Sequence, residues 1–481
     1  MSILDTFLRS AQNAKRMSDW HKVTDGTDIR KIHFVGIKGV AMAGLAVICK
    51  ERGFDVAGSD VPSSFITDKV LEKAGIKVFS SFSSENLSWG PDLVVVGASW
   101  DESNEEVDGA VKKQIPMVTE SDLRGGISEE KKTIAVTGVH GKTTTTSLLA
   151  YIFSLAKKDP SYLIGTALIP DLGVNGHWSR GEHFIVEGDE YVKSRKNKTP
   201  KFLDLSPKTS IITSIEWEHV DVYENLSALE RAYDALVKKT DGPVIACRDW
   251  KSTASYKEQY GDKVITYGEN LESDWVLTNY DQKLHYSTFS VIKNKRIFDD
   301  FELRLIGRFN ALNALACLVV ADYYEIPLST VREAFRTFSG LERRMEVEHR
   351  KDIIFIDDYA HHPTAVKNAL HAIRNTYERR RIVCVFQPHM ASRTKAFFHE
   401  FSRCFTDADV VVLVDIFASA REKDVDVSTQ DLFREIQRYH ADVHYFGGIE
   451  DTTEGLRSII KPRDIVVTMG AGDVYKIRDA F

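Results

Sequence analysis

The chain has 481 residues, too many for one hydrophobic core, so about two to four domains are expected. It is 43% hydrophobic and 28% charged, as ordinary globular proteins are, and its formal net charge is −7. This charge argues against nucleic acid as a partner, because nucleic-acid-binding proteins carry a basic surplus, but it does not exclude small anionic ligands.

Cysteine usage and hydropathy indicate a cytoplasmic protein. The five cysteines lie far apart in apolar runs without a CxxC pair, so we expect buried free thiols rather than disulfides or a zinc site. The N-terminus lacks the apolar region of a signal peptide. No apolar run is long enough to span a bilayer, so no membrane partner is expected.

The predicted elements begin after a polar leader, residues 1–29, for which the sequence indicates no task. Apolar runs and helical patterns then alternate through the first expected domain, 30–125. In chain order, the sequence predicts a strand at 31–36, a helix at 39–52, and strands at 54–58 and 92–97. The last run is entirely apolar, as strands buried in a parallel sheet are. The polar residues 122–132 then predict a linker.

The alternation restarts in the second expected domain, 126–339. Its predicted strands are 133–138, 183–188 and 209–214, and its predicted helices start at Gly141 and near 226, 309 and 328. Residues 338–344 predict a second boundary. The third expected domain, 340–481, has predicted strands at 353–357, 381–386, 409–415 and 464–470. The predicted fold class is therefore α/β, with three successive α/β domains that are Rossmann-like, P-loop and Rossmann-like in turn.

The strongest single motif is a phosphate loop, in which Gly141, Lys142 and Thr143 lie between an apolar strand and an apolar helix. Backbone N–H groups at the start of such a helix point at phosphate oxygens, lysine adds positive charge, and the threonine hydroxyl can ligate Mg²⁺. The first glycine of the usual pattern is missing here, but Gly138 is retained. A chance glycine turn is the alternative, and it is unattractive because four consecutive threonines begin a helix poorly.

A weaker motif is the glycine turn after the first strand. Gly36 and Gly39 precede a helix, and the next strand ends at Ser59 and Asp60. Glycines let a backbone approach a pyrophosphate, and an acidic residue about twenty positions on can bind a ribose hydroxyl. The pattern suits NAD as well as a UDP-sugar, and tight packing of a helix on a strand explains the glycines equally well.

Further segments carry a family resemblance. They are VEGDEY (186–191), SIEWEHVDVY (214–223), IGRFNALNALA (306–316), LERRMEV (341–347), IDDYAHHPT (356–364), FQPHMASRT (386–394) and MGAGDVYKI (469–477). Together with the two glycine motifs, they make residues 31–477 resemble the Mur ligases, the ATP-dependent enzymes that form amide bonds on a nucleotide-linked muramic acid in bacterial cell-wall synthesis.

The resemblance implies a role for each motif residue. The implied ATP site consists of Gly138, Gly141, Lys142, Thr143, Thr144, Asn310, Asn313, Arg344 and Asp358. The implied catalytic residues are Lys142, His219 and Arg344, and the implied ligands of Mg²⁺ or Mn²⁺ are Thr143, Glu187 and His219. The implied UDP-sugar site consists of Gly36, Gly39, Met42, Ser59 and Asp60, and the implied amino-acid site of Tyr359, His389 and Arg393.

Each residue alone has a plainer explanation. Glu187 can end a solvated strand, His219 can lie in a surface loop, and His361 and His362 can cap a helix ahead of Pro363. If all these plainer explanations were correct, half a dozen segments would have to match the family's motifs, in the family's order, by coincidence. The joint pattern therefore favours the ligase.

The implied chemistry is activation of a carboxylate. Transfer of the γ-phosphoryl group of ATP to the carboxylate of UDP-N-acetylmuramate makes an acyl phosphate, which an amine then attacks. The enzyme must neutralise charge and align the reactants, and no covalent nucleophile is needed.

Two amine donors remain open. The implied amino-acid site suits the carboxylate of L-alanine, but an insertion at 193–201 looks more like the ligases that recycle an intact L-alanyl-γ-D-glutamyl-diaminopimelate tripeptide. Most such basic runs are solvated loops, and a basic flap that meets an anionic substrate is the alternative. Phe309 and Met390 replace a histidine and an arginine that are usual in the family.

Two other classes of protein explain less of the sequence. An NAD-dependent dehydrogenase would use only the first glycine turn, and a non-catalytic P-loop nucleotide-binding protein would use only the phosphate loop. ATP hydrolysis that requires both a UDP-muramic acid and an amine separates the three classes. The sequence predicts no oligomeric state.

Overall fold

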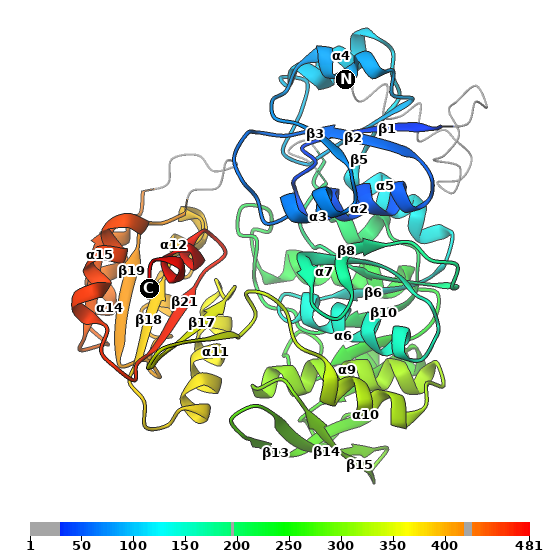
Figure 1. Ribbon diagram of the computed structural model, residues 1–481. Helices are drawn as coiled ribbons and strands as arrows, with labels where there is room; N and C mark the ends of the chain where they lie inside the picture. The colour runs from blue at the N-terminus through cyan, green and yellow to red at the C-terminus, as the bar shows by residue number, and fades with distance from the viewer. Residues whose placement is uncertain (1–28, 194–196, 418–425) are drawn as a thin grey trace.

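The computed structural model describes residues 29–193, 197–417 and 426–481, and it arranges them in three sheets that follow one another along the chain (Figure 1). The predicted leader lies outside these residues except for Ile29. The prediction of three successive α/β units is confirmed. In Figure 1 the first sheet lies above the second, and the C-terminal domain lies to one side of the central one.

The N-terminal sheet has five parallel strands in the order β3-β2-β1-β4-β5. They are β1 (Lys31–Val35), β2 (Asp55–Ser59), β3 (Lys77–Phe79), β4 (Leu93–Val96) and β5 (Met117–Thr119). The helices are α2 (Val40–Glu51), α3 (Asp68–Lys73), the 3₁₀ helix η2 (Ser84–Trp89), α4 (Glu105–Lys112) and α5 (Glu120–Glu129). The strand order reverses between β1 and β4, and ligands of such sheets bind at this reversal, beyond the carboxyl ends of the strands.

The central sheet has ten strands, in the order β15-β14-β13-β12-β11-β10-β6-β9-β7-β8. They are β6 (Lys132–Thr137), β7 (Ser161–Ile169), β8 (Gly173–His177), β9 (His183–Glu187), β10 (Pro207–Ile212), β11 (Val244–Cys247), β12 (Val264–Gly268), β13 (Trp275–Gln282), β14 (Ser287–Lys293) and β15 (Arg296–Leu303). Its helices are α6 (Lys142–Leu155), η3 (Lys201–Asp204), α7 (Leu226–Lys239), α8 (Tyr256–Tyr260), η4 (Gly261–Lys263), α9 (Arg308–Tyr323) and α10 (Leu328–Thr337). The pairs β7–β8, β13–β14 and β14–β15 are antiparallel, which the sequence patterns did not predict.

The C-terminal sheet has six strands in the order β16-β17-β21-β18-β19-β20, of which only the edge strand β16 runs antiparallel to its neighbour. They are β16 (Glu346–Arg350), β17 (Ile353–Asp358), β18 (Ile382–Phe386), β19 (Val410–Val414), β20 (Val443–Gly447) and β21 (Ile465–Met469). Its helices are α11 (Pro363–Thr376), α12 (Ala391–Ala396), α13 (Phe398–Phe401), α14 (Thr429–Ile436), α15 (Ile449–Ile459) and η5 (Val474–Ala480).

The linker predicted at 122–132 is wrong, because most of this stretch forms α5. Thr119 and Asp122 close a capping box, in which each side chain accepts a hydrogen bond from the other residue's backbone N–H at 3.1 Å. Leu123 and Ile127 turn inward and are completely buried. The polar composition belongs to a capped helix that is buried along most of its length, and Glu120 and Arg124 of this helix line the cavity described below.

The first two domains share one hydrophobic core. This continuous core contains Phe34 and Leu45 of the first domain and Leu163 and Phe184 of the second.

The prediction for the cysteines is confirmed. All five are free and buried, and burial raises the pKa of Cys49 to about 12. Among the described residues no helix is both long and apolar enough to cross a membrane.

Candidate active site

A cavity of about 730 Å³ lies where the three domains meet. The N-terminal domain contributes the glycine turn with Gly36, Gly39 and Met42. The central domain contributes the phosphate loop and the ends of its parallel strands, and the C-terminal domain contributes the segments that follow β17 and β18. Residues from all three implied binding sites therefore line one space.

The phosphate loop joins β6 to α6, and its two glycines are required by close packing. Gly138 and Gly141 have φ of +120° and +81°, values that side chains rarely adopt. A Cβ at Gly138 would collide with Thr213, and one at Gly141 with the side-chain amide of Asn313. Helix α6 has no side-chain cap, so the N–H groups of its first turn are not taken up by a capping side chain. Such a terminus suits a phosphate.

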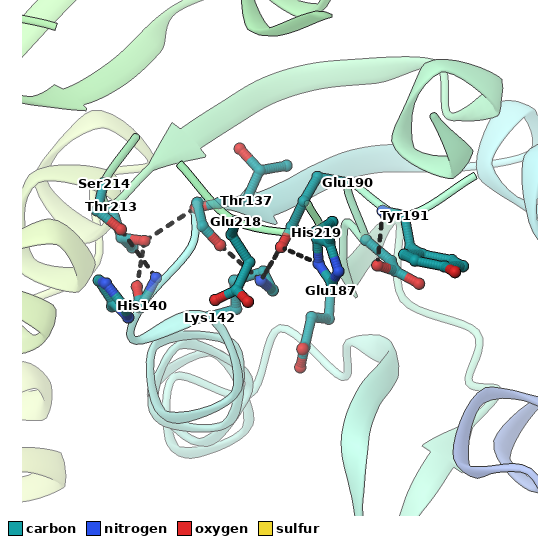
Figure 2. A network of polar contacts seen from close by, with 12 residues as sticks. Thr137, His140, Lys142, Glu187, Glu190, Tyr191, Thr213, Ser214, Glu218 and His219 are labelled. Atoms are coloured by element: carbon teal, nitrogen blue, oxygen red, sulfur yellow. Dashed lines mark hydrogen bonds and ion pairs between the residues drawn. The ribbon is translucent and has the colours of Figure 1, made fainter. Parts of the chain in front are cut away.

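Lys142 reaches from the start of α6 into a cluster of carboxylates (Figure 2). Its Nζ donates to the Gly138 carbonyl at 2.6 Å and to both carboxylate oxygens of Glu190 at 3.0 Å. Burial opposes the ammonium charge, but the carboxylates of Glu190 and Glu187 outweigh it and raise the pKa of Lys142. The lysine is therefore a permanent cation beside the helix terminus.

Glu190 also binds His219, whose Nε2 lies 3.0 Å from Oε1 of the carboxylate. Burial raises the pKa of Glu190, but the nearby charge of Lys142 and the contact with His219 outweigh it, so the net shift is downward. For the imidazole, burial lowers the pKa, and the hydrogen bond to Glu190 reverses this and raises it. With Asp189, these residues form a group whose ligand atoms lie within 4.8 Å of one another. Carboxylate oxygens with an imidazole suit a divalent cation such as Mg²⁺ or Mn²⁺.

Thr143 and Glu187, two implied metal ligands, contact each other. The threonine hydroxyl donates to Oε1 of Glu187 at 3.2 Å, while Oε2 accepts from the Gly165 N–H at 2.9 Å. Burial raises the pKa of Glu187 despite the nearby charge of Lys142. A divalent cation here would relieve the desolvation of the carboxylate, so the donor set fits the implied metal. His219 contacts Glu190 rather than this pair.

Arg344 brings the C-terminal domain to the phosphate loop. Its Nη2 donates to the Thr143 hydroxyl at 3.4 Å, and its guanidinium lies 4.8 Å from the ring centre of Tyr359. Asp358 holds the adjoining backbone by accepting from the N–H groups of Met345 and Ala360, both at 2.8 Å. The implied γ-phosphate arginine is thus next to the implied metal-binding threonine.

The two asparagines implied for adenine lie on the first turns of α9. The Asn310 side chain donates to the Ile306 carbonyl at 2.8 Å, and Asn313 donates to Asn310 at 3.3 Å. Both line the cavity, as does Phe309, which presents an aromatic ring where the family usually has a histidine. A flat base can stack on such a ring.

The three residues of the implied amino-acid site also lie together, and Glu218, which the sequence analysis missed, contacts one of them. Tyr359, His389 and Arg393 all line the cavity. Nε and Nη2 of Arg393 both lie 2.7 Å from Oε1 of Glu218, and Nη1 lies 3.0 Å from Nδ1 of His389. Burial raises the pKa of Glu218, but Arg393 more than reverses this and holds the pKa well below its usual range. Arg393 is thus the centre of a buried ion pair between domains.

Two residues of the implied UDP-sugar site do not line the cavity. The Ser59 hydroxyl donates to the buried carboxylate of Glu106. Asp60 accepts from the backbone N–H of Lys38 at 2.8 Å and so closes the glycine turn. The glycine turn itself borders the cavity, but in this structure Ser59 and Asp60 support the turn rather than its ligand face.

A second missed cluster joins the phosphate loop to the C-terminal domain. His140 Nε2 lies 2.7 Å from Oε2 of Glu216, and the Thr364 hydroxyl donates to the other oxygen at 2.7 Å. His362 caps α11, as the plainer explanation proposed, because its ring accepts from the Thr364 N–H at 3.3 Å. The spacing of Glu216 and Glu218, two residues apart in SIEWEHVD, was the available signal, since it puts both side chains on one side of an extended segment.

Ion pairs hold the two ends of the insertion at 193–201. These ends are therefore neither a solvated loop nor a basic flap that is free to move. Lys193 lies 3.0 Å from Asp122 and 2.7 Å from Asp204, and Lys201 lies 3.0 Å from Asp189. Both ammonium groups are largely buried, and only Lys201 lines the cavity. Lys198 is exposed, and Arg195 and Lys196 lie outside the described residues.

Comparison with known proteins supports one family over the whole described fold. Residues 31–132 match the Mur ligase family catalytic domain, 136–321 the Mur ligase middle domain, and 343–472 the Mur ligase glutamate ligase domain. The UDP-N-acetylmuramate–L-alanine ligase of Desulfitobacterium hafniense is 36% identical over 93% of this chain and 98% of its own length. That of Clostridium tetani is 35% identical over 94% and 98%.

Solved structures agree with this assignment. The crystal structure of the UDP-N-acetylmuramate–alanine ligase from Thermotoga maritima has a TM-score of 0.78 at 27% identity, covering 94% of this chain and 98% of the other. A murein peptide ligase from Psychrobacter arcticus has a TM-score of 0.68 at 23% identity, covering 93% and 97%, and so shares the fold. With three matching domains in the family's order and a phosphate loop and carboxylate cluster at their junction, the chain belongs to the Mur ligase family.

Proposed function

We propose that the chain joins L-alanine to UDP-N-acetylmuramate with the consumption of ATP, in peptidoglycan synthesis. The observation that carries this proposal is the single cavity shared by the three domains, in which phosphate-loop, carboxylate and implied amino-acid-site residues face one another. The alanine-adding enzymes that match over more than nine-tenths of the chain support the choice of substrates. Membership of a ligase family removes the dehydrogenase and the non-catalytic nucleotide-binding protein from consideration.

ATP is proposed to bind between the central and C-terminal domains. The N–H groups at the start of α6, which no side chain caps, would hold its phosphates, with Lys142 and Arg344 approaching from opposite domains. Thr143, Glu187 and the group around Glu190 would hold Mg²⁺ or Mn²⁺, which when bound neutralises phosphate charge. The asparagines of α9 would face the base.

Catalysis then depends on charge and alignment. The carboxylate of the muramic acid and the γ-phosphate are both anions, and their repulsion must be offset before they can react. Lys142 and Arg344 supply fixed positive charge at the phosphoryl group. The amine would approach from the C-terminal side, where Tyr359, His389 and Arg393 form a pocket suited to a small amino acid's carboxylate.

The tripeptide remains a second candidate donor, and the insertion at 193–201 is the observation that favours it. Lys201 lines the cavity, so a longer acidic donor would meet positive charge there. A cytosolic location and the preference between Mg²⁺ and Mn²⁺ stay predictions.

One assay separates the donors. Purified protein is given ATP, Mg²⁺, UDP-N-acetylmuramate and either L-alanine or the tripeptide, and the product is identified by mass. We expect an alanine adduct formed with release of ADP. If the tripeptide adduct forms much faster than the alanine adduct, the chain is a recycling ligase instead. If neither donor gives an adduct, the proposed function is wrong.

A further inference from the structure

Arg124 of α5 is a cavity-lining cation that neither the motifs nor the mechanism above uses. The residue is only 3% exposed, yet it borders the cavity. Its Nη1 donates to the main-chain carbonyl of Glu187 at 3.4 Å, a long contact. Its Nε lies 3.4 Å from Oε1 of Glu120, one turn earlier in the same helix. The guanidinium therefore contacts the backbone of Glu187, and the side chain of Glu187 contacts the phosphate loop.

The hydrogen-bonding capacity of this guanidinium is mostly unused. Within the described residues neither Nε nor Nη2 of Arg124 has a hydrogen-bond acceptor, and Oε1 of Glu120 has no donor, so their ion pair lacks hydrogen-bond geometry. An arginine cannot lose its proton to escape this situation. A buried polar group without a partner costs about 1–3 kcal/mol, and more when it is charged. Such a residue at a cavity wall calls for an anionic ligand.

Neighbouring charges do not meet this need. Glu120 is shared, because its other oxygen lies 3.5 Å from Nζ of Lys201. Lys201 is itself held by Asp189 at 3.0 Å. Lys193, a buried cation of the same region, differs, since it has two close carboxylates and does not line the cavity. Among the described residues of this group, Arg124 is thus the cation that lines the cavity while two of its guanidinium nitrogens, Nε and Nη2, have no hydrogen-bond acceptor.

We propose that Arg124 binds the carboxylate of the muramic acid and holds it in line with the phosphoryl group to be transferred. This inference rests on the proposed function and adds a positioning residue to it. The reacting carboxylate must come within about 3–3.5 Å of the phosphorus, and Arg124 touches Glu187, whose own carboxylate binds Thr143 of the phosphate loop. The pyrophosphate of the same substrate is expected farther away, at the glycine turn of the N-terminal domain.

A pair of ligands tests this assignment. UDP-N-acetylglucosamine has the same nucleotide and the same hexosamine ring as UDP-N-acetylmuramate but lacks the lactyl ether that carries the carboxylate. Binding of each is measured by calorimetry, with Mg²⁺ and a non-hydrolysable ATP analogue, to the wild type, Arg124→Gln and Arg124→Lys. Lys193→Gln is the matched control, because it removes a buried cation of the same region that does not line the cavity.

For Arg124→Gln we expect UDP-N-acetylmuramate to bind about tenfold to a hundredfold more weakly, with UDP-N-acetylglucosamine unchanged. Arg124→Lys keeps the charge without the two-pronged geometry, so its loss should be smaller but again confined to the carboxylated ligand. It also serves if Arg124→Gln does not fold. Lys193→Gln should change neither affinity.

Two results would overturn the inference. An equal loss for both ligands would assign Arg124 to the pyrophosphate or to the framework, and unchanged affinities in a folded Arg124→Gln would leave it a structural role only. If the wild type shows no preference for UDP-N-acetylmuramate, the proposed function fails first, and this inference fails with it.

Discussion

Replacing Arg393 by methionine should destabilise the junction of the central and C-terminal domains by about 3–5 kcal/mol, the cost of leaving one partner of a buried ion pair alone. Both Nε and Nη2 lie 2.7 Å from one oxygen of Glu218, and the two side chains are only 6% and 5% exposed. Once its partner was gone, the carboxylate would be left unpaired in a largely buried position. Two unit charges about 4 Å apart at an effective dielectric of about 20 attract by about 4 kcal/mol, which agrees in size.

A double variant separates the ion pair from the packing around it. Adding Glu218→Gln to Arg393→Met removes the stranded charge, so most of the lost stability should return. Turnover should not return, because the guanidinium proposed to bind the carboxylate of alanine is still missing. Denaturant unfolding of the wild type, both single variants and the double variant measures the first effect, and the KM for alanine measures the second.

Acid gives an independent check on the same pair. The folded pKa of Glu218 is depressed well below 4.5, so the stability it contributes is fully present above about pH 4.5 and is lost as pH falls towards the folded pKa. In Arg393→Met, burial without the arginine raises the pKa of Glu218, so the variant relieves the stranded charge by protonation as pH falls. The stability difference between the wild type and Arg393→Met should therefore be largest at alkaline pH and shrink in acid. Two results would refute the assignment of a buried, energetically coupled pair. One is that Arg393→Met is as stable as the wild type, and the other is that the double variant is no more stable than Arg393→Met alone.

Four further substitutions test the rest of the site. Lys142→Ala should abolish turnover in a protein that calorimetry shows to be folded, and near-normal activity would remove the phosphate loop from the mechanism. Glu187→Gln and His219→Ala should each raise the Mg²⁺ concentration for half-maximal activity by about tenfold or more, whereas unchanged titrations would make both residues structural. Glu216→Ala should loosen the contact with α11, seen as faster amide exchange at the start of that helix, and unchanged exchange would show that Glu216 does not link the domains.

The parallel strands could be predicted from sequence because they are short, apolar on both faces and followed by helices. Predicted strands at 92–97 and 464–470 correspond to β4 and β21 within one residue at each end. The antiparallel extension β13–β15 could not be predicted, since its half-buried strands mix polar and apolar residues and carry no turn motif as distinct as the phosphate loop. Helix α5 was mistaken for a linker because its composition is polar and glycine-rich, although most of its residues are buried.

For the site, motifs identified residues but not their partners. Lys142, Glu187 and Arg344 were named from separate segments, and the structure brings them to one cavity. Glu190 and Glu218 were missed as functional neighbours because no local pattern, the spacing of Glu216 and Glu218 included, shows which distant cation a carboxylate pairs with. Spacing equally could not show that Asp60 accepts a hydrogen bond from the N–H of Lys38.

The charges around the cavity show how anionic substrates can enter a largely buried site. Lys142 pairs with Glu190, Arg393 with Glu218 and Lys201 with Asp189, so these cations already have carboxylate partners supplied by the protein. Because isolated buried charges are costly, this pairing keeps the cations in place. Under the proposed function, a phosphate or carboxylate that bound there would exchange one anionic partner for another, and the displaced carboxylates would become available to a divalent cation. Arg124 lacks such a hydrogen-bonded partner, and it is therefore the position where a substrate carboxylate would gain most.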